Sequence, residues 1–328
     1  MKNTIPAALL LSMAALSAQA GPLKDPQWMA WLDAGKAVEL DKAGRAQVHS
    51  QPDDAQGYLA VALAATTTAE PAALDAALKT AEACVARLPQ SAQCHYALGS
   101  VIGQQAMTAS MFKMVGMASR IREAFSKAVE LDPLFFEARD GLVQYYLMAP
   151  SIAGGSVTKA REAVEAVQAR QPEQAKLLRA RIAAKEEKWA DAERELNSIK
   201  SDDKGLRDEA RGVWGQMAFK LMSDKQPAKA RPMFEQLVKD YPGHAIGPYG
   251  LGRVLIDNGK ADEAIALLER ARALEGAADL PIDHRLGIAL LAKGDKAGAK
   301  AALERFVKNT RANPRNLEDA KKRLAELA

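Results

Sequence analysis

Apolar residues in the second half of the chain recur at helical spacing around small residues. Three of these small residues lie 34 and 35 positions apart: Ala218, Gly252 and Gly287. A second set of small residues follows 12 positions after the first set: Ala230, Ala264 and Ala299. Two helices that cross closely need small residues at the crossing and large apolar residues beside it. The pattern therefore predicts stacked helical hairpins, each of which buries its apolar face against its neighbours.

The N-terminal half carries the same kind of pattern less regularly. Residues 21–53 are predicted to form a leading helical segment and residues 54–172 a series of degenerate or extended hairpins. Regular hairpins are expected over residues 173–311, and residues 312–328 predict a capping helix with several charged positions on one side. The chain is rich in alanine and charged residues and poor in aromatic ones, a composition that favours helix. We therefore expect an all-α chain.

The three regular units resemble the tetratricopeptide repeat, with Trp214 at the first signature position of the family. Residues 54–328 can be aligned with this repeat if two insertions are allowed. Residues 94–172 also resemble a secreted bacterial variety of the family, because they carry a lengthened hairpin, the string Ala-Val-Glu-Leu-Asp-Pro at 128–133 and an Ala-Pro…Gly-Gly turn at 149–155. The resemblance implies a right-handed superhelix (α-solenoid) of about seven hairpins that binds a protein or peptide partner without catalysis.

Residues 1–20 have the three parts of a secretory signal peptide. Lys2 gives a positive start, residues 7–16 are apolar, and Ala18-Gln19-Ala20 is a small-residue cleavage pattern. We expect cleavage after Ala20 and a periplasmic location for the mature chain. No later stretch approaches the roughly 20 uninterrupted apolar residues that span a bilayer, so no integral membrane segment is expected after cleavage.

The charges and the scattered chemistry-bearing residues argue against several classes of function. The 45 basic and 41 acidic residues nearly balance and form no concentrated basic patch, so a nucleic-acid partner is not expected. No group of His, Cys, Asp and Glu has metal-ligand spacing, and no glycine-rich phosphate loop occurs, so neither a metal nor another cofactor is predicted. Ser156 and Lys159 have the spacing of an acyl-transfer pair, but its companion motifs are absent. Ser156 is better interpreted as a helix cap, and we expect no enzyme.

Two cysteines, Cys84 and Cys94, flank a turn between helices that is marked by Pro89. A disulfide at this turn would join the end of one helix to the start of the next, and it suits an oxidising compartment. The alternative is a pair of buried apolar thiols, which helix crossings also accept.

The resemblance implies that the first helix of each hairpin lines a concave groove. The residues expected to face this groove are Gln144, Arg181, Phe219, Met222, Tyr249, Arg253, Ile256, His284 and Ile288. Arg181, Phe219, Tyr249, Arg253 and His284 are the favoured partner contacts, since arginine and tyrosine suit a carboxylate or an acidic peptide. The alternative is that they are solvated side chains or form ion pairs within the repeats. These residues support the hypothesis of a periplasmic adaptor in the assembly of an envelope complex.

Two interruptions of the repeat offer a different hypothesis. Met107, Met111, Met114 and Met117 follow one another at helical spacing and provide either adaptable core, a partner or lipid contact, or thioether ligands for Cu(I). Gly154 and Gly155 precede a predicted helix and provide either an anion cradle or a turn that requires positive φ. The alternative function is therefore a carrier of a small ligand or of copper.

Overall fold

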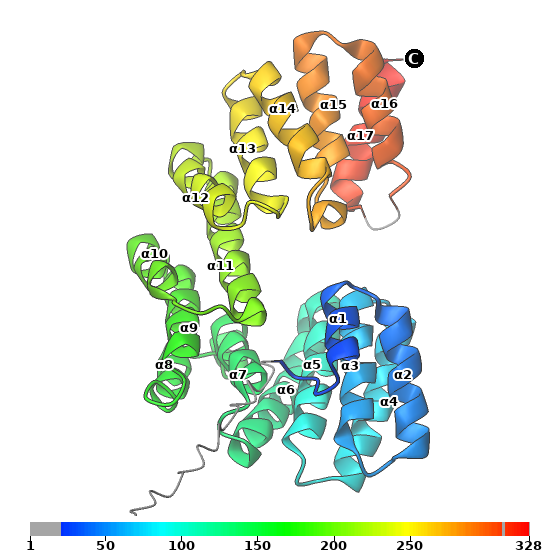
Figure 1. Cartoon of the computed structure of the whole chain (residues 1–328), viewed down its shortest axis with the longest axis vertical. Coiled ribbons are helices and arrows are strands. Elements are labelled where there is room, and N and C mark those ends of the chain that lie inside the picture. The colour runs from blue at the N-terminus through cyan, green and yellow to red at the C-terminus, as the bar shows by residue number, and fades with distance from the viewer. Residues whose placement is uncertain (1–20, 310–311, 328) are drawn as a thin grey trace, which may run out of the picture. The chain divides into compact units, whose positions relative to one another are not determined.

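The computed structural model describes residues 21–309 and 312–327, in which all regular structure is helical (Figure 1). These residues form 17 α-helices and two short 3-10 helices. The expected all-α fold is confirmed, and the chain is an α-solenoid. The predicted signal peptide, residues 1–20, lies outside the described residues.

The chain forms two compact units, divided in sequence after Ser156. Unit 1 contains the described residues up to 156, and unit 2 contains the described residues from 157 onward. The predicted change from extended to regular hairpins after residue 172 concerns the spacing of the repeat, which is a different property from this division into compact units.

Unit 1 begins with two helices where the sequence predicted one leading segment. Gly35, at φ +65°, separates the first helix from the second. The Asp25, Asp54 and Ser91 side chains accept hydrogen bonds from backbone N–H groups and so cap α1, α3 and α5. The helices of unit 1 are α1 (Pro26–Asp33), α2 (Ala37–Ser50), α3 (Ala55–Thr68), α4 (Pro71–Arg87), α5 (Ala92–Thr108), α6 (Met111–Leu131), α7 (Phe136–Met148) and η1 (Ser151–Ala153).

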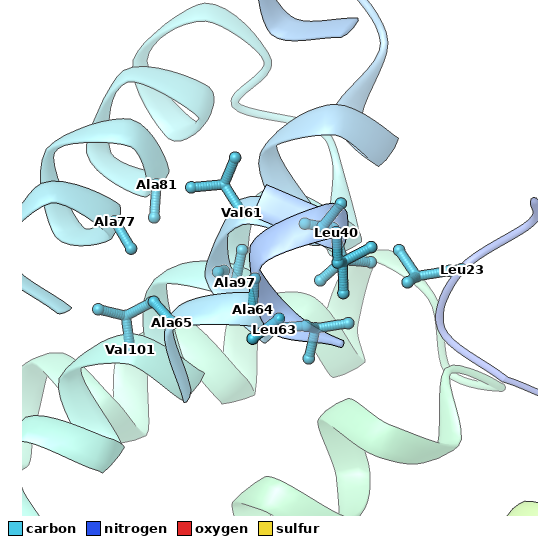
Figure 2. Packing of buried hydrophobic residues seen from close by; sticks show 14 of the residues in the cluster. Leu23, Leu40, Val61, Leu63, Ala64, Ala65, Ala77, Ala81, Ala97 and Val101 are labelled. Carbon is cyan, nitrogen blue, oxygen red and sulfur yellow. The ribbon is translucent and has the colours of Figure 1, made fainter. Parts of the chain in front are cut away.

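Helix α3 is the centre of the unit 1 core, and α2, α4 and α5 pack around it. A Cβ atom added at Gly44 of α2 would lie 2.8 Å from the carbonyl oxygen of Gly57 in α3, so these two backbones cross in direct contact. Figure 2 shows small and medium side chains of α3, α4 and α5 meeting in this core, including Val61, Ala65, Ala77, Ala81, Ala97 and Val101.

A disulfide joins Cys84 of α4 to Cys94 of α5 across the turn that contains Pro89. The two Cα atoms are 5.3 Å apart, and both side chains are buried beside Ala55 and Tyr58. Of the two alternatives that the sequence left open, the structure contains the disulfide.

Unit 2 is built from antiparallel helices that follow one another along the chain. Four hairpins pair α9 with α10, α11 with α12, α13 with α14, and α15 with α16. The helices of unit 2 are α8 (Val157–Glu165), α9 (Pro172–Lys185), α10 (Trp189–Ser198), α11 (Lys204–Ser223), α12 (Pro227–Asp240), α13 (Ile246–Asp257), α14 (Ala261–Arg272), η2 (Ala277–Asp279), α15 (Ile282–Lys293), α16 (Lys296–Phe306) and α17 (Pro314–Glu326).

Glycines in the first helices of these hairpins allow the second helices to approach. A Cβ added at Gly252 would lie 2.8 Å from Leu268 Cγ of α14, and one added at Gly287 would lie 2.6 Å from Leu303 of α16. The predicted role of these two glycines at the helix crossings is therefore confirmed. Gly250 makes a tighter contact, since a Cβ there would lie 2.1 Å from ring carbons of Phe234 in the preceding hairpin.

Helix α17 covers the last hairpin. Its Ala320 is fully buried against a cluster that contains Leu303 and Phe306. His284 of α15 lies beneath α17 with 3% of its surface exposed, and its Nε2 is 2.7 Å from Asp319 Oδ2. Burial lowers the pKa of His284, and the opposing effect of the Asp319 hydrogen bond is smaller.

Reduction of the disulfide should destabilise the α4–α5 turn. Closing a loop of this size restricts the unfolded chain and contributes about 2–3 kcal/mol. We expect hydrogen exchange of the α4 and α5 amides to accelerate in reductant by the corresponding factor of roughly 30 to 150. The matched control is the Cys84→Ala/Cys94→Ala variant, whose exchange reductant should leave unchanged. Equal protection of the oxidised and reduced wild-type chain would contradict the prediction.

Gly250→Ala should destabilise unit 2, because the new methyl group would overlap the buried Phe234 ring. Overpacking of this kind costs about 1–3 kcal/mol. Gly212→Ala is the matched control, because a Cβ at Gly212 in α11 would meet nothing within 4 Å. This control should stabilise α11 by about 0.5–1 kcal/mol through helix propensity. The measurement is the rate of hydrogen exchange of the α11, α12 and α13 amides in both variants. Equal changes of this rate in the two variants would show that the close contact between Gly250 and Phe234 is unimportant.

Docking of α17 should weaken when the pH falls below about 6.5, the ordinary pKa of histidine. Because the pKa of His284 is lowered in the folded state, the unfolded chain binds a proton first as the pH falls. The stabilisation of docked α17 by neutral His284 is therefore complete above pH 6.5. It is lost as the pH falls from 6.5 to the lower pKa of His284 in the folded state. Hydrogen exchange of α17, corrected for intrinsic pH dependence, measures the effect. His284→Gln retains a partner for Asp319 but does not titrate, so a similar pH step in this variant would refute the assignment.

Candidate functional site

The side chains expected to face the groove fall into two groups by burial. Phe219, Arg253 and Ile256 are partly exposed. Gln144 and Ile288 are also partly exposed. The second group is buried and consists of Arg181, Met222, Tyr249 and His284.

Three of these side chains, Phe219, Tyr249 and Arg253, form a cluster with the buried Phe234. We call it the aromatic–arginine cluster. Phe219 comes from α11, Phe234 from α12, and the other two from α13. The Phe219 ring centroid is 5.2 Å from that of Phe234 and 6.0 Å from that of Tyr249. Tyr249 and Phe234 are 2% and 0% exposed, so their rings form a fixed base for the partly exposed Phe219.

Arg253 lies over two of these rings. Its guanidinium carbon is 5.4 Å from the Phe219 centroid and 5.9 Å from the Tyr249 centroid. Both distances are within the range of a cation–π interaction. No carboxylate of the described residues forms an ion pair with Arg253. The rings therefore hold a permanently charged group in place while its N–H donors stay available to an external acceptor.

Apolar surface adjoins this arginine. Ile256 follows Arg253 on α13, and both Ile256 and Phe219 pack as partly buried residues on the core of the last hairpins. The cluster thus presents one cation beside apolar side chains. This arrangement suits a partner segment that carries a carboxylate next to an apolar residue.

Arg181 ties two helices together instead of lining an open surface. Its side chain is 8% exposed and forms an ion pair with Glu209, which joins α9 to α11. The ion pair lies between two successive hairpins, whereas the alternative expected from the sequence was an ion pair within one repeat.

His284 belongs to the contact between α15 and α17. Its ring centroid is 5.2 Å from that of Phe306, and its Nε2 contacts Asp319. The side chains of the described residues offer no hydrogen-bond partner to the buried Nδ1. Because α17 covers this ring, His284 supports the cap, and the exposed candidates for direct partner contact are Phe219 and Arg253.

The methionine-rich segment extends two helices rather than forming a loop. Helix α5 ends at Thr108 and α6 begins at Met111. Met114 and Met117 are half-buried against the core of this hairpin, whereas Met107 and Met111 are 61% and 67% exposed. The four thioethers are therefore divided between core and solvent.

The Gly-Gly turn uses its glycines for backbone geometry. Gly154 has φ +92°, and a Cβ added at Gly155 would lie 1.8 Å from the carbonyl oxygen of Ala149. The N–H groups of Gly154, Gly155 and Ser156 already donate to backbone carbonyls. An anion cradle would need these same N–H groups, so the turn interpretation accounts for the pair.

A second stacking of arginine on an aromatic ring was not predicted from the sequence. Arg207 and Arg211 of α11 lie 5.8 and 5.7 Å from the centroid of Tyr241, which follows α12. Arg211 also forms an ion pair with Asp208, so this arginine pair is engaged within the fold. The signal in the sequence is the tyrosine directly before the proline that follows α12.

Two further classes of site were sought in the part of the chain that the structure describes. Its helices include none that is both long enough and apolar enough to cross a membrane. Its His, Cys, Asp and Glu side chains form no group of three or more that could hold a metal ion.

Comparisons with known proteins agree with the repeat pattern. Residues 221–279 and 284–309 match two models described as tetratricopeptide repeat. No curated protein sequence matches the chain.

Solved structures are similar to this chain at low sequence identity. The structure of yeast Tom70 is 15% identical with a TM-score of 0.62, over 89% of this chain and 60% of Tom70. A tetratricopeptide repeat protein from Parabacteroides merdae is 12% identical with a TM-score of 0.47, over 80% of this chain and 96% of that chain. The first match contains Phe234, Tyr249 and Arg253 of the aromatic–arginine cluster, and the second lies in the α15–α16 hairpin that follows. The second half of the chain therefore contains tetratricopeptide repeats, within residues 221–279 and 284–309.

Proposed function

We propose that this chain is a non-catalytic scaffold that holds an acidic segment of a protein partner against the aromatic–arginine cluster. The observation that carries the proposal is Arg253, which is stacked on two rings and forms no ion pair with a carboxylate of residues 21–309 or 312–327. Stacked hairpins present extended binding surfaces, and the tetratricopeptide repeat is typical of protein-interaction scaffolds.

The physical basis is preorganisation of the arginine. A free arginine side chain loses rotamer freedom when it binds, and this loss reduces affinity. The Phe219 and Tyr249 rings already restrict Arg253, so less freedom remains to be lost. A carboxylate from the partner would accept two parallel N–H donors, and an adjacent apolar residue would contact Phe219 and Ile256.

We propose further that the scaffold works in the periplasm, in the assembly of an envelope complex. The signal-peptide pattern over residues 1–20 supports export. The Cys84–Cys94 disulfide supports the same location, because such bonds persist in oxidising compartments.

Arg253→Gln should weaken partner binding at least about tenfold, since a lost charge-assisted hydrogen bond costs about 1.5–3 kcal/mol. The measurement is quantitative capture of partners from periplasmic extract at low and high salt. The wild-type chain should also lose affinity as salt rises.

The matched control is Arg231→Gln in α12, where Arg231 is exposed and pairs with Glu235 one turn away. This control should bind like the wild-type chain. Unchanged capture by Arg253→Gln would exclude the cluster as the contact, and an equal loss in both variants would point to net charge instead.

A further inference from the structure

The end of the α5–α6 hairpin carries an exposed apolar surface that the groove does not explain. We call it the hairpin tip and define it by Met107, Met111, Phe112, Lys113 and Val115. The four apolar side chains are 61%, 67%, 90% and 39% exposed, in chain order. Soluble proteins seldom leave neighbouring large apolar side chains this open unless the surface has a partner.

The tip projects beyond the packed part of the hairpin. Among residues 111–117 of α6 none is buried, and the first buried residue is Ala118. On the α5 side, Ala106 is buried and the next two residues are exposed. A Cβ added at Gly103 or Gly116 would meet nothing within 4 Å, so both helices are open here.

The exposed apolar residues share one side of the first turns of α6. Phe112 and Val115 are three positions apart, and Met111 and Val115 are four apart, so their side chains lie on one helical face. Met114 and Met117 point instead into the core with Ile121 and Phe125. The first turns of α6 thus have two apolar faces, one packed against the core and one exposed.

The charged residue within the hairpin tip itself is Lys113. Residues 83–122 contain no Asp or Glu and four Arg or Lys. Lys113 forms no ion pair with the described residues. On the packed helix α4, Glu82 pairs with Arg120 at 2.6 Å, and Asp75 accepts a hydrogen bond at 2.8 Å from the uncharged amide of Gln105. The projecting part of the hairpin therefore combines apolar side chains with a free cation.

We propose that the hairpin tip inserts into the surface of a membrane that contains anionic lipid. A projecting apolar end with an unpaired lysine suits the acyl–headgroup boundary, where the apolar side chains enter the lipid and the ammonium group reaches the headgroups. The tip lies in unit 1 and acts independently of the aromatic–arginine cluster in unit 2.

A fluorescent label at position 112 tests the insertion directly. The chain has two cysteines, both in the disulfide, so Phe112→Cys supplies a single free thiol for the environment-sensitive dye NBD. The full-length chain is mixed with vesicles of phosphatidylcholine alone or with one quarter phosphatidylglycerol. A local label is required because residues 1–20 are themselves apolar and could bind lipid.

We expect the NBD emission at position 112 to shift to the blue and rise several-fold with the anionic vesicles. Lys113→Gln in the labelled chain should weaken this response about fivefold, the effect of one cation near an anionic surface. The matched control label is Val38→Cys in α2, which replaces a 77% exposed apolar side chain that is followed directly by Glu39. This control should not respond.

Two results would overturn the proposal. A position 112 label that is insensitive to both vesicle types would reject lipid insertion and leave a protein as the occupant of the tip. An equal response at positions 38 and 112 would show that the whole chain adsorbs without a specific tip. Neither result would affect the groove proposal, which depends on Arg253.

Discussion

The close crossing of helices at small residues is the constraint on which this structure depends. In unit 2, Gly252 and Gly287 let Leu268 and Leu303 pack onto the backbone of the facing helix. In unit 1, Gly44 and Gly57 bring the backbones of α2 and α3 into direct contact. Each crossing fixes how far apart two helices lie, so repetition of the crossing fixes the position of every exposed side chain along the hairpins.

The aromatic–arginine cluster is a consequence of that repetition. Gly250 allows the Phe234 ring to lie against the backbone of α13, and Phe219 then packs on Phe234. Arg253, one turn after Tyr249, lies over the partly buried ring of Phe219 and the buried ring of Tyr249. Arg253 is thus positioned by packing on aromatic rings, without a loop.

The sequence predicted the features that depend on local pattern. The glycine positions, the helix ends near prolines, the cap and the proximity of the two cysteines all follow from spacing along one or two helices. The pairing of α2 with α3 through Gly44 and Gly57 was not predicted, because it lies outside the regular period. The burial of Arg181, Tyr249 and His284 was not predicted either. It depends on which neighbouring helix packs on each side chain: Glu209 of α11 pairs with Arg181, and Asp319 of α17 contacts His284.

The most direct test of the scaffold assignment is site-specific photocrosslinking from the face of α13. A photoreactive amino acid at position 256 lies one turn from Arg253, and the same amino acid at the exposed position 266 of α14 is the control. The account predicts discrete protein adducts from position 256 in periplasmic extract, their loss in Arg253→Gln, and none from position 266. Equal adducts from both positions, or none from position 256, would contradict the claim that this cluster holds a protein partner.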